Sequence, residues 1–244
     1  LRSGFEQLLD WSERLLLYSF QQLGVFQGTG ETYTAIGLKS RLGIIEEYSR
    51  LYDALLDILV GAGYLELSEG TLQTSKRVSV QSLSRLSEEH TSLSGTHSSL
   101  SSYAALVWQC VTHYPDILTG KVTAVSVMFP DGSKTLVEGI YKGNPLVDHY
   151  NELVAGLVKD YASRRGHEKP LHILEVGAGT GGTSKFVLEA LSGFGGELEY
   201  HYTDISGSFT AYGKDTYGSR YPFMQFSVLN AETDPLSQGY ESGS

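Results

Sequence analysis

The chain is poor in cysteine and in basic residues, and it has no long apolar run. Its single cysteine, Cys110, excludes both a disulfide framework and a cysteine-based zinc site, and it is typical of the reducing cytosol. Lys and Arg number 18 against 28 Asp and Glu, which gives a formal net charge of −10. Nucleic acid is disfavoured as a partner because phosphate binding needs clustered basic side chains. No segment reaches membrane-spanning length or opens as a signal peptide, so we expect no membrane partner.

What the sequence does contain is enough apolar surface for a packed interior. Hydrophobic residues make up 41% of the 244 positions, and 16 residues are tyrosine. This length accommodates one large domain or two small ones. Because the sequence opens with Leu1 and ends in GYESGS, we interpret it as part of a longer protein.

The first third predicts helices followed by a hairpin. Apolar residues recur at helical spacing over 5–26, where Gly24 ends the helix, and again over 46–62. Residues 64–75 alternate around Ser68-Glu69-Gly70, which predicts a β-hairpin. This order is similar to a winged helix, whose functional interpretation is DNA binding. Segment 46–60 carries four acids and one arginine, so we favour a packing or lid module instead.

The middle of the chain gives weaker signals. Residues 79–102 contain ten serines, which predicts a flexible linker. Helices are expected over 103–113 and 146–164, with a turn at Pro130-Asp131-Gly132 between them. We place the domain boundary after residue 145, which gives domains 1–145 and 146–244.

From residue 171 the pattern becomes strand, helix, strand. A buried strand is expected at 171–176 and further strands at 198–205 and 223–230, with helices over 183–194 and 210–218 between them. Thr183 or Ser184 is the expected cap of the first of these helices. The order predicts the βαβαβ half of a doubly wound parallel sheet. The fold class is therefore α/β, with a mostly helical first domain followed by part of a Rossmann-like sheet.

The stretch ILEVGAGTGGTSK between the first strand and its helix is a glycine-rich loop with several possible ligands. A phosphate-binding P-loop is disfavoured because Thr183 stands where that motif needs lysine. A dinucleotide fingerprint is satisfied by Gly177, Gly179 and Gly182, with Asp204 lying 22 residues beyond Gly182. On these features alone NAD remains a candidate.

Glu175, close before the first glycine, favours a different ligand. A carboxylate there repels a pyrophosphate and suits a cationic group. S-adenosylmethionine carries an ammonium group and a sulfonium, so the glycine loop would approach its methionine end and Glu175 would accept from the ammonium. Asp204 would then bind both ribose hydroxyls. The plainer alternatives are that Glu175 caps its own loop and that Asp204 is a strand-end turn residue.

Several stretches together resemble the methyltransferase domains of polyketide synthases and hybrid peptide–polyketide synthases. They are HILEVGAGTGGTS, YTDIS and YPFMQFSVLNAETDP, and upstream DILTGKVTAVSVMFPDGS and IYKGNPLVDHYN. The amino-terminal helices and the YLEL hairpin resemble the helical lid of that family, so the resemblance covers nearly the whole chain. It implies a class I methyltransferase core with a winged-helix-like lid before it.

The resemblance also implies a donor site. The loop wraps S-adenosylmethionine, Asp204 binds ribose, the end of the third strand contacts adenine, and Tyr150 lines the pocket. Asn230 stands where the family usually has Asp, and its amide can still accept from the adenine amino group. The alternatives are a turn role for Asn230 and a core position for Tyr150. The expected donor-binding residues are Tyr150, Glu175, Gly177, Ala178, Gly179, Thr180, Gly181, Asp204, Ile205, Asn230 and Ala231.

The reaction implied is methylation of an acyl chain tethered by phosphopantetheine to an acyl carrier protein, inside a multidomain synthase. The α-carbon of a β-ketoacyl thioester is the expected acceptor. Hydroxyl methylation and a non-catalytic scaffold are the alternatives. In the family the catalytic His and its Glu partner follow a fourth strand, which this sequence does not include. We therefore assign no catalytic residue, interpret His149, His167 and His201 as solvated or structural, and expect no metal.

A complete methyltransferase fold has seven strands, with the first strand in the middle of the sheet. Three are recognisable here, so the first strand is expected to expose an apolar edge that can pair or aggregate. We expect the 244 residues alone to be inactive.

Overall fold

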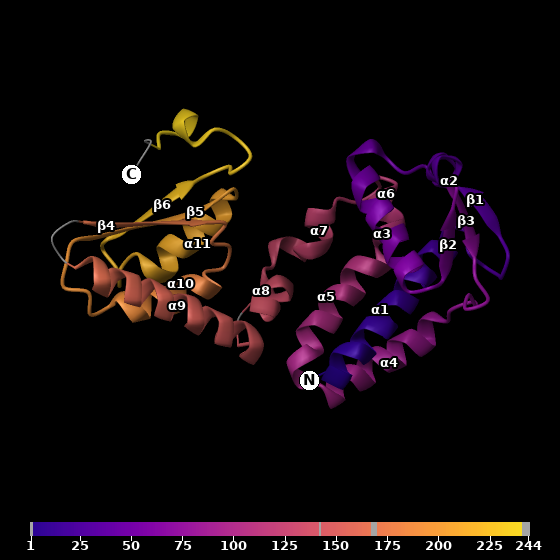
Figure 1. The fold of residues 1–244 in the computed structure, drawn as a ribbon, viewed down its shortest axis with the longest axis horizontal. Coiled ribbons are helices and arrows are strands. Elements are labelled where there is room, and N and C mark those ends of the chain that lie inside the picture. Colours follow the sequence, from indigo (N-terminus) through magenta and orange to yellow (C-terminus); the bar gives the residue numbers. More distant parts are fainter. Residues whose placement is uncertain (1, 142, 167–169, 241–244) are drawn as a thin grey trace. The chain divides into compact units, whose positions relative to one another are not determined.

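The computed structural model describes residues 2–141, 143–166 and 170–240. The chain divides into two compact units, Leu1–Ile140 and Tyr141–Ser244, which are described one at a time (Figure 1). Within the described residues, no helix combines the length and the apolar character needed to cross a membrane.

The first unit is mostly helical. Its longer helices are α1 (Arg2–Gln22), α3 (Ser49–Gly61), α4 (Leu83–Thr96) and α5 (Ser101–Thr112). Shorter ones are α2 (Ala35–Leu42), α6 (Tyr114–Leu118), α7 (Ala124–Met128) and α8 (Thr135–Tyr141), with single 3-10 turns η1 (Glu46–Tyr48), η2 (Ser98–Leu100) and η3 (Pro130–Gly132). The predicted helices over 5–26, 46–62 and 103–113 are confirmed to within a few residues at each end, whereas α2, α6, α7 and α8 were not predicted.

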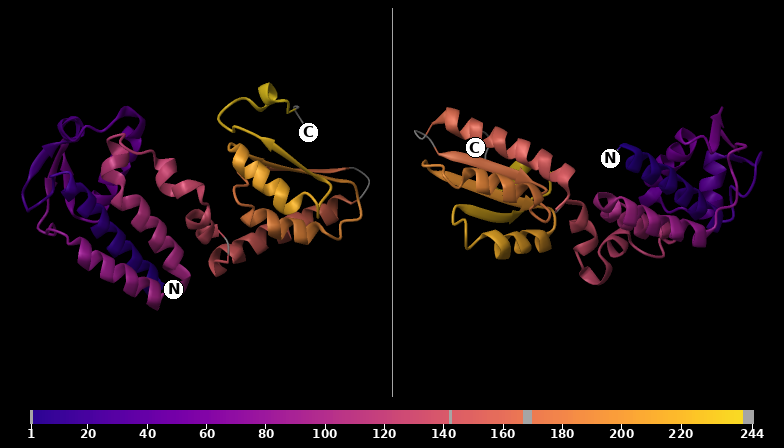
Figure 2. Two further views of the ribbon diagram at one scale, coloured as in Figure 1. Left: turned by 180° about the vertical axis from the view of Figure 1, so that it is seen from behind. Right: turned by 90° about the horizontal axis from the view of Figure 1, so that it is seen from below.

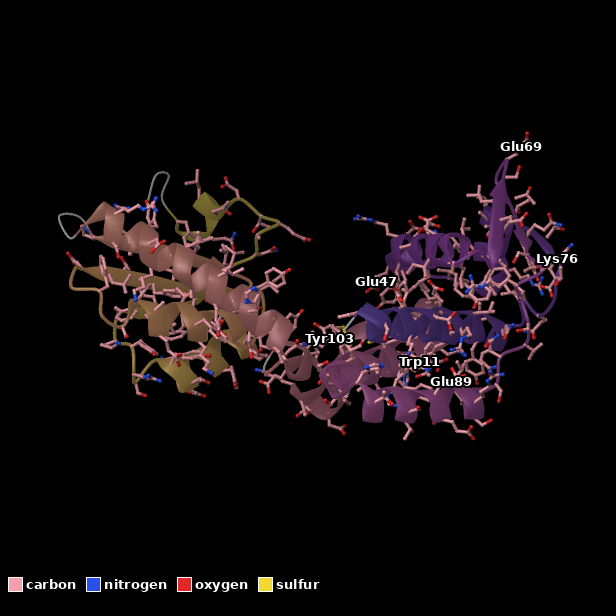
Figure 3. All side chains as sticks on the ribbon, turned by 60° about the horizontal axis from the view of Figure 1, so that its bottom comes forward. Trp11, Glu47, Glu69, Lys76, Glu89 and Tyr103 are labelled. Carbon is pink, nitrogen blue, oxygen red and sulfur yellow. The ribbon has the colours of Figure 1, made fainter. Side chains whose placement is uncertain are left out.

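Helix α1 organises the interior of this unit. Its buried apolar side chains are those of Leu8, Trp11, Leu15, Leu16, Leu17 and Phe20. Burying each such side chain contributes about 1.5–3 kcal/mol relative to leaving it exposed. The Trp11 indole, labelled in Figure 3, donates from its Nε1 to the Leu86 carbonyl at 2.9 Å. The Trp11 and Trp108 rings are stacked, with their centroids 6.2 Å apart. A single side chain therefore ties α1 to both α4 and α5.

A small antiparallel sheet completes the unit. Its strands are β1 (Thr32–Thr34), β2 (Leu65–Ser68) and β3 (Thr71–Thr74), in the order β1-β3-β2. The turn between β2 and β3 places Glu69 and Gly70 at φ of 50° and 76°, as two-residue hairpin turns require. The predicted hairpin is confirmed. Strand β1 was not predicted because three residues show too little alternation.

The prediction of a flexible linker over 79–102 is wrong. Residues 83–96 form helix α4, η2 follows, and α5 begins at Ser101. Leu86, Leu93 and Leu100 are spaced seven apart, and Leu86 and Leu100 are buried against the core. The serines lie mostly on the exposed side. A serine-rich composition thus conceals an amphipathic helix whose apolar residues are few but regularly spaced.

The second unit is the predicted βαβαβ arrangement. Strands β4 (Leu171–Val176), β5 (Leu198–Asp204) and β6 (Met224–Val228) form a parallel sheet in the order β4-β5-β6. The helices are α9 (Pro145–Arg165), α10 (Gly182–Leu191) and α11 (Gly207–Tyr217), and the 3-10 turn η4 spans Pro235–Gln238. Within the described residues β4 pairs with β5 alone, so it lies at an edge, as expected.

The helices of this unit cover one face of the sheet (Figures 1 and 2). Right-handed crossovers in one direction place α10 and α11 on the same side, where Leu171, Tyr200 and Tyr202 are buried. On the other face Leu174 and Val176 are 49% and 52% exposed, so the prediction that β4 is a fully buried strand is wrong for this face. The residues after β6 return over it, where the Tyr240 and Ser227 hydroxyls are 3.0 Å apart.

His90 on α4 gives the first unit a predictable pH dependence. Its ring lies 5.5 Å from both Trp11 and Trp108, and its buried Nε2 has no hydrogen-bond partner in the described structure. Burial lowers the pKa of His90 below its ordinary 6.5. The unfolded state therefore binds the proton more readily, and stability is lost as the pH falls from the ordinary pKa through the folded one.

We expect acidification from about pH 7.5 to about pH 5 to destabilise this unit less in His90→Phe than in the wild type. Both tryptophans of the chain lie in this unit, so urea titrations followed by tryptophan fluorescence report on it alone. His149→Phe, at an exposed histidine of α9, is the matched control. Its free energy of unfolding should change with pH as that of the wild type does. An equal change of unfolding free energy with pH in all three proteins would contradict the assignment of this pH dependence to His90.

Candidate functional site

The glycine loop lies at the carboxyl end of β4 and leads directly into α10. Gly177, Gly179 and Gly181 have φ of 71°, 58° and 73°, in the left-handed region that side chains other than glycine rarely adopt. Gly181 is also the N-cap of α10. The loop therefore brings bare backbone and the first turn of a helix, whose N–H groups have no intrahelical acceptors, to the edge of the sheet.

Asp204, the last residue of β5, is joined to this loop. Its Oδ2 accepts from the Gly179 N–H at 2.9 Å, and its Oδ1 accepts from the Ser206 N–H at 2.8 Å. The side chain is buried, with 7% exposed. Each carboxylate oxygen has a second lone pair, so the group retains acceptor capacity for hydroxyls. The structure brings Asp204 and Gly179 together, and contact of Asp204 with a ribose stays a prediction.

Glu175 directs its carboxylate under the loop. Its Oε2 accepts from the Ser184 hydroxyl at 2.7 Å and from the Tyr200 hydroxyl at 2.8 Å. Burial raises the pKa of Glu175, and these two hydrogen bonds oppose the rise. The structure thus gives Glu175 partners within the protein, and acceptance from a donor ammonium stays a prediction.

The predicted capping of α10 by Thr183 or Ser184 is wrong. The N-cap is Gly181, which has no side chain to accept from the helix, and neither hydroxyl caps it. Ser184 donates to Glu175, and Thr183 donates to the Asn151 Oδ1 at 2.8 Å. Both hydroxyls are used as donors because a carboxylate and an amide oxygen lie within their reach.

Two tyrosines that the sequence did not single out hold the loop carbonyls. The Tyr202 hydroxyl donates to the Gly179 carbonyl at 2.8 Å, and the Tyr217 hydroxyl donates to the Gly181 carbonyl at 2.9 Å. Tyr200 and Tyr202 stand two apart in β5 and so share one face of the sheet. The two-residue spacing of these tyrosines was the sequence pattern that could have placed them together on one face. The position of Tyr217 on α11 was not predictable.

Asn151 on α9 is a further residue that sequence reasoning missed. It is 7% exposed, and its Nδ2 is buried without a partner among the described residues. Its Oδ1 accepts from Thr183, so it lies beside the first turn of α10. The preceding Tyr150 is 61% exposed and is available at the surface rather than in the core.

The remaining predicted residues lie where neighbouring strands end. Ile205 is 65% exposed, and the Leu229 N–H donates to the Asp204 carbonyl at 3.0 Å, which brings the end of β6 beside the end of β5. Asn230 has a turn role: its Oδ1 accepts from the Glu232 N–H at 2.9 Å. Ala231 is exposed beside it. Contact of these residues with adenine stays a prediction.

The histidines named above lie at different places in the second unit. His172 and His201 flank Glu199, at 2.9 Å and 3.1 Å from its carboxylate oxygens, on the sheet face opposite the helices. His149 is exposed on α9, and His167 lies outside the described residues. Across the described ranges, no group of His, Cys, Asp and Glu side chains is arranged to hold a metal ion.

Comparison with known proteins places this arrangement in context. No family model matches the chain. It is 40% identical to the polyketide synthase PksM of Bacillus subtilis over 133 residues, which are 53% of this chain and 3% of that protein. Among solved structures, the DszA carbon methyltransferase is 44% identical with a TM-score of 0.85, over 98% of this chain and 61% of that one. The CurJ carbon methyltransferase is 27% identical with a TM-score of 0.87, over 98% and 62%.

The chain therefore spans about three fifths of the length of the solved domains that it matches. The fold predicted from the sequence, a helical region followed by a class I methyltransferase sheet, is confirmed by these neighbours.

Gly181 is the loop position with the least room for a side chain. A Cβ there would lie 2.6 Å from Tyr217 Cε2 and 2.7 Å from its hydroxyl, at a φ that disfavours any other residue. We expect Gly181→Ala to destabilise the second unit by about 2 kcal/mol or more, from the left-handed backbone and the displaced tyrosine together. Gly193→Ala, where the added carbon meets nothing within 4 Å, is the control.

Unfolding of the second unit can be followed by far-UV circular dichroism, with tryptophan fluorescence as a monitor of the first unit. Equal losses in Gly181→Ala and Gly193→Ala would contradict the close approach of Tyr217.

The raised pKa of Glu175 predicts how its replacement depends on pH. The folded state binds the proton more tightly than the unfolded state, so stability is lost as the pH rises from the ordinary value of 4.5 through the folded pKa. Glu175→Gln does not titrate. We therefore expect the variant to gain stability relative to the wild type as the pH rises above 4.5, in paired urea titrations followed by circular dichroism. If the difference in unfolding free energy between Glu175→Gln and the wild type does not change with pH, the raised pKa of Glu175 is refuted.

Proposed function

Because this chain belongs to the methyltransferase domains of polyketide synthases, we propose that it binds S-adenosylmethionine as a methyl donor. The observation that carries the proposal is the 44% identity to a carbon methyltransferase over 98% of the chain, together with the glycine loop joined to Asp204. The acceptor is the α-carbon of a β-ketoacyl chain on an acyl carrier protein.

The donor site is the carboxyl edge of the sheet. The left-handed glycines let the loop backbone approach the methionine end, and the open first turn of α10 favours the donor carboxylate because helix N-termini attract anions. Asp204 accepts from the ribose hydroxyls through the lone pairs that Gly179 and Ser206 leave free.

The adenine end extends along the ends of the next strands. Ile205 offers an exposed apolar side chain, and Asn230 and Ala231 follow β6. Since the Asn230 Oδ1 already accepts from the Glu232 N–H, the Asn230 Nδ2 is the more available group and can donate to a ring nitrogen. Tyr150 and Asn151, whose Nδ2 has no partner among the described residues, close the site from α9.

The reaction class follows from the chemistry of the acceptor. A carbon between a ketone and a thioester is acidic, so a general base removes its proton and leaves an enolate. The enolate carbon forms a bond to the donor methyl as the carbon–sulfur bond breaks, and neutral S-adenosylhomocysteine leaves. The role of the described residues is to hold the donor, and none of them is assigned as the base.

The partners follow from the relatives. Those relatives are polyketide synthases of which this chain matches a small part, so other domains of a synthase are the proposed neighbours and the carrier protein delivers the acyl chain. The single, half-buried Cys110 supports the reducing cytosol as the compartment.

Donor binding can be measured by titrating the chain with S-adenosylhomocysteine in a calorimeter. We expect Asp204→Ala to weaken binding by about ten-fold or more, since hydrogen bonds to a charged group contribute about 1.5–3 kcal/mol. Asp215→Ala removes the same charge from an exposed position of α11 and should bind as the wild type does. Absence of binding to the wild type would refute the donor site and favour a scaffold.

The acceptor can be identified with the whole synthase that contains this chain. Incubation with S-adenosylmethionine and a β-ketoacyl carrier protein should add one methyl group to the phosphopantetheine-bound chain. Tandem mass spectrometry should then place it on the α-carbon. A methyl group on oxygen would overturn carbon methylation while leaving the donor site standing.

A further inference from the structure

Three tyrosine hydroxyls donate hydrogen bonds to residues of the glycine motif. Tyr200, Tyr202 and Tyr217 donate to Glu175, Gly179 and Gly181 at 2.8, 2.8 and 2.9 Å. The two tyrosines that reach backbone carbonyls act on the loop itself.

Each of these two hydrogen bonds fixes a whole peptide group. In a planar trans peptide the C=O of one residue and the N–H of the next point in opposite directions. The Gly179 carbonyl faces Tyr202, so the Thr180 N–H faces away from it. The Gly181 carbonyl faces Tyr217 and also accepts from the Lys185 N–H at 3.1 Å, so the Gly182 N–H faces away from both.

The two phenols are rigidly placed. Tyr202 is fully buried, and a Cβ on Gly213 of α11 would lie 2.6 Å from its ring, so only a glycine there admits it. Tyr217 lies close to Gly181, and the centroids of the Tyr202 and Tyr217 rings are 6.3 Å apart. Burial raises the pKa of Tyr217 to about 12 and that of Tyr202 further, so both hydroxyls stay protonated and donate throughout the physiological range.

We propose that Tyr202 and Tyr217 are positioning residues for the methyl donor, and that they turn the Thr180 and Gly182 N–H groups toward the carboxylate of its methionine part. This inference rests on the proposed donor site. The carboxylate is the anionic group of the donor, and two oriented N–H groups at the start of α10 are suited to an anion. The ribose and adenine are held by Asp204 and the strand ends, which these hydroxyls do not contact.

A pair of ligands separates this role from general stability. S-adenosylhomocysteine has the amino-acid part, whereas 5′-methylthioadenosine has the same adenosine and sulfur without it. We expect Tyr202→Phe and Tyr217→Phe each to weaken S-adenosylhomocysteine binding by about five-fold, the effect of one neutral hydrogen bond. Binding of 5′-methylthioadenosine should stay within about two-fold of the wild type. Tyr161→Phe makes the same change on the exposed side of α9 and should alter neither affinity.

Amide hydrogen exchange of the ligand-free protein gives an independent test. The Gly181 N–H donates to the Ala178 carbonyl at 2.9 Å, and the Lys185 N–H donates to the Gly181 carbonyl. In Tyr217→Phe these two amides should exchange faster, while amides in the middle of β5 keep their wild-type rates. The fold then remains intact while the loop loosens.

The outcomes distinguish the two hypotheses. Equal weakening of both ligands, or unchanged S-adenosylhomocysteine affinity with unchanged exchange, would overturn the positioning role and leave the donor site standing. A wild-type chain that binds neither ligand would overturn the proposed function, and the positioning role with it.

Discussion

The hydrogen bond from the Gly179 N–H to the Asp204 carboxylate is the contact on which the second unit is organised. It joins the turn after β4 to the end of β5, and Asp204 holds the start of the next turn through the Ser206 N–H. The loop can reach that carboxylate only because glycines accept left-handed backbone on either side of it. A buried carboxylate in turn requires such donors, since burial without them is costly. The loop and the acid therefore stabilise each other.

The hydrogen-bonded side chains that support the glycine loop fix its shape. Glu175, Ser184 and Tyr200 form one hydrogen-bonded group, and Tyr202 and Tyr217 continue it along the backbone. Each member satisfies another, which is the condition under which a buried polar group rigidifies rather than weakens a fold. The Glu175 carboxylate accepts from both hydroxyls of this group. It thus belongs to the support of the loop as the structure describes it.

Much of this arrangement could be predicted from the sequence, and the failures have clear causes. The strands and the loop were predictable because a short apolar run, closely spaced glycines and a strand-end acid are all local signals. Helix α4 was missed because serines dominate its composition, although its Leu86 and Leu93 preserve the spacing of an amphipathic helix. The roles of Ser184, Tyr202 and Tyr217 were missed because they depend on strand register and on where α11 packs, which no local pattern encodes. The exposed face of β4 was missed because a parallel strand is usually covered on both sides.

The one-sided placement of α9, α10 and α11 has a consequence for the order of folding. None of the hydrogen bonds described around the loop joins residues more than 36 positions apart in the chain, and the widest separation is that of Gly181 and Tyr217. The entropy lost in closing a segment grows only slowly with its length, and contacts of short range form quickly. The loop and its tyrosines can therefore assemble from one short, contiguous stretch of newly made chain, while the opposite face of the sheet is still bare.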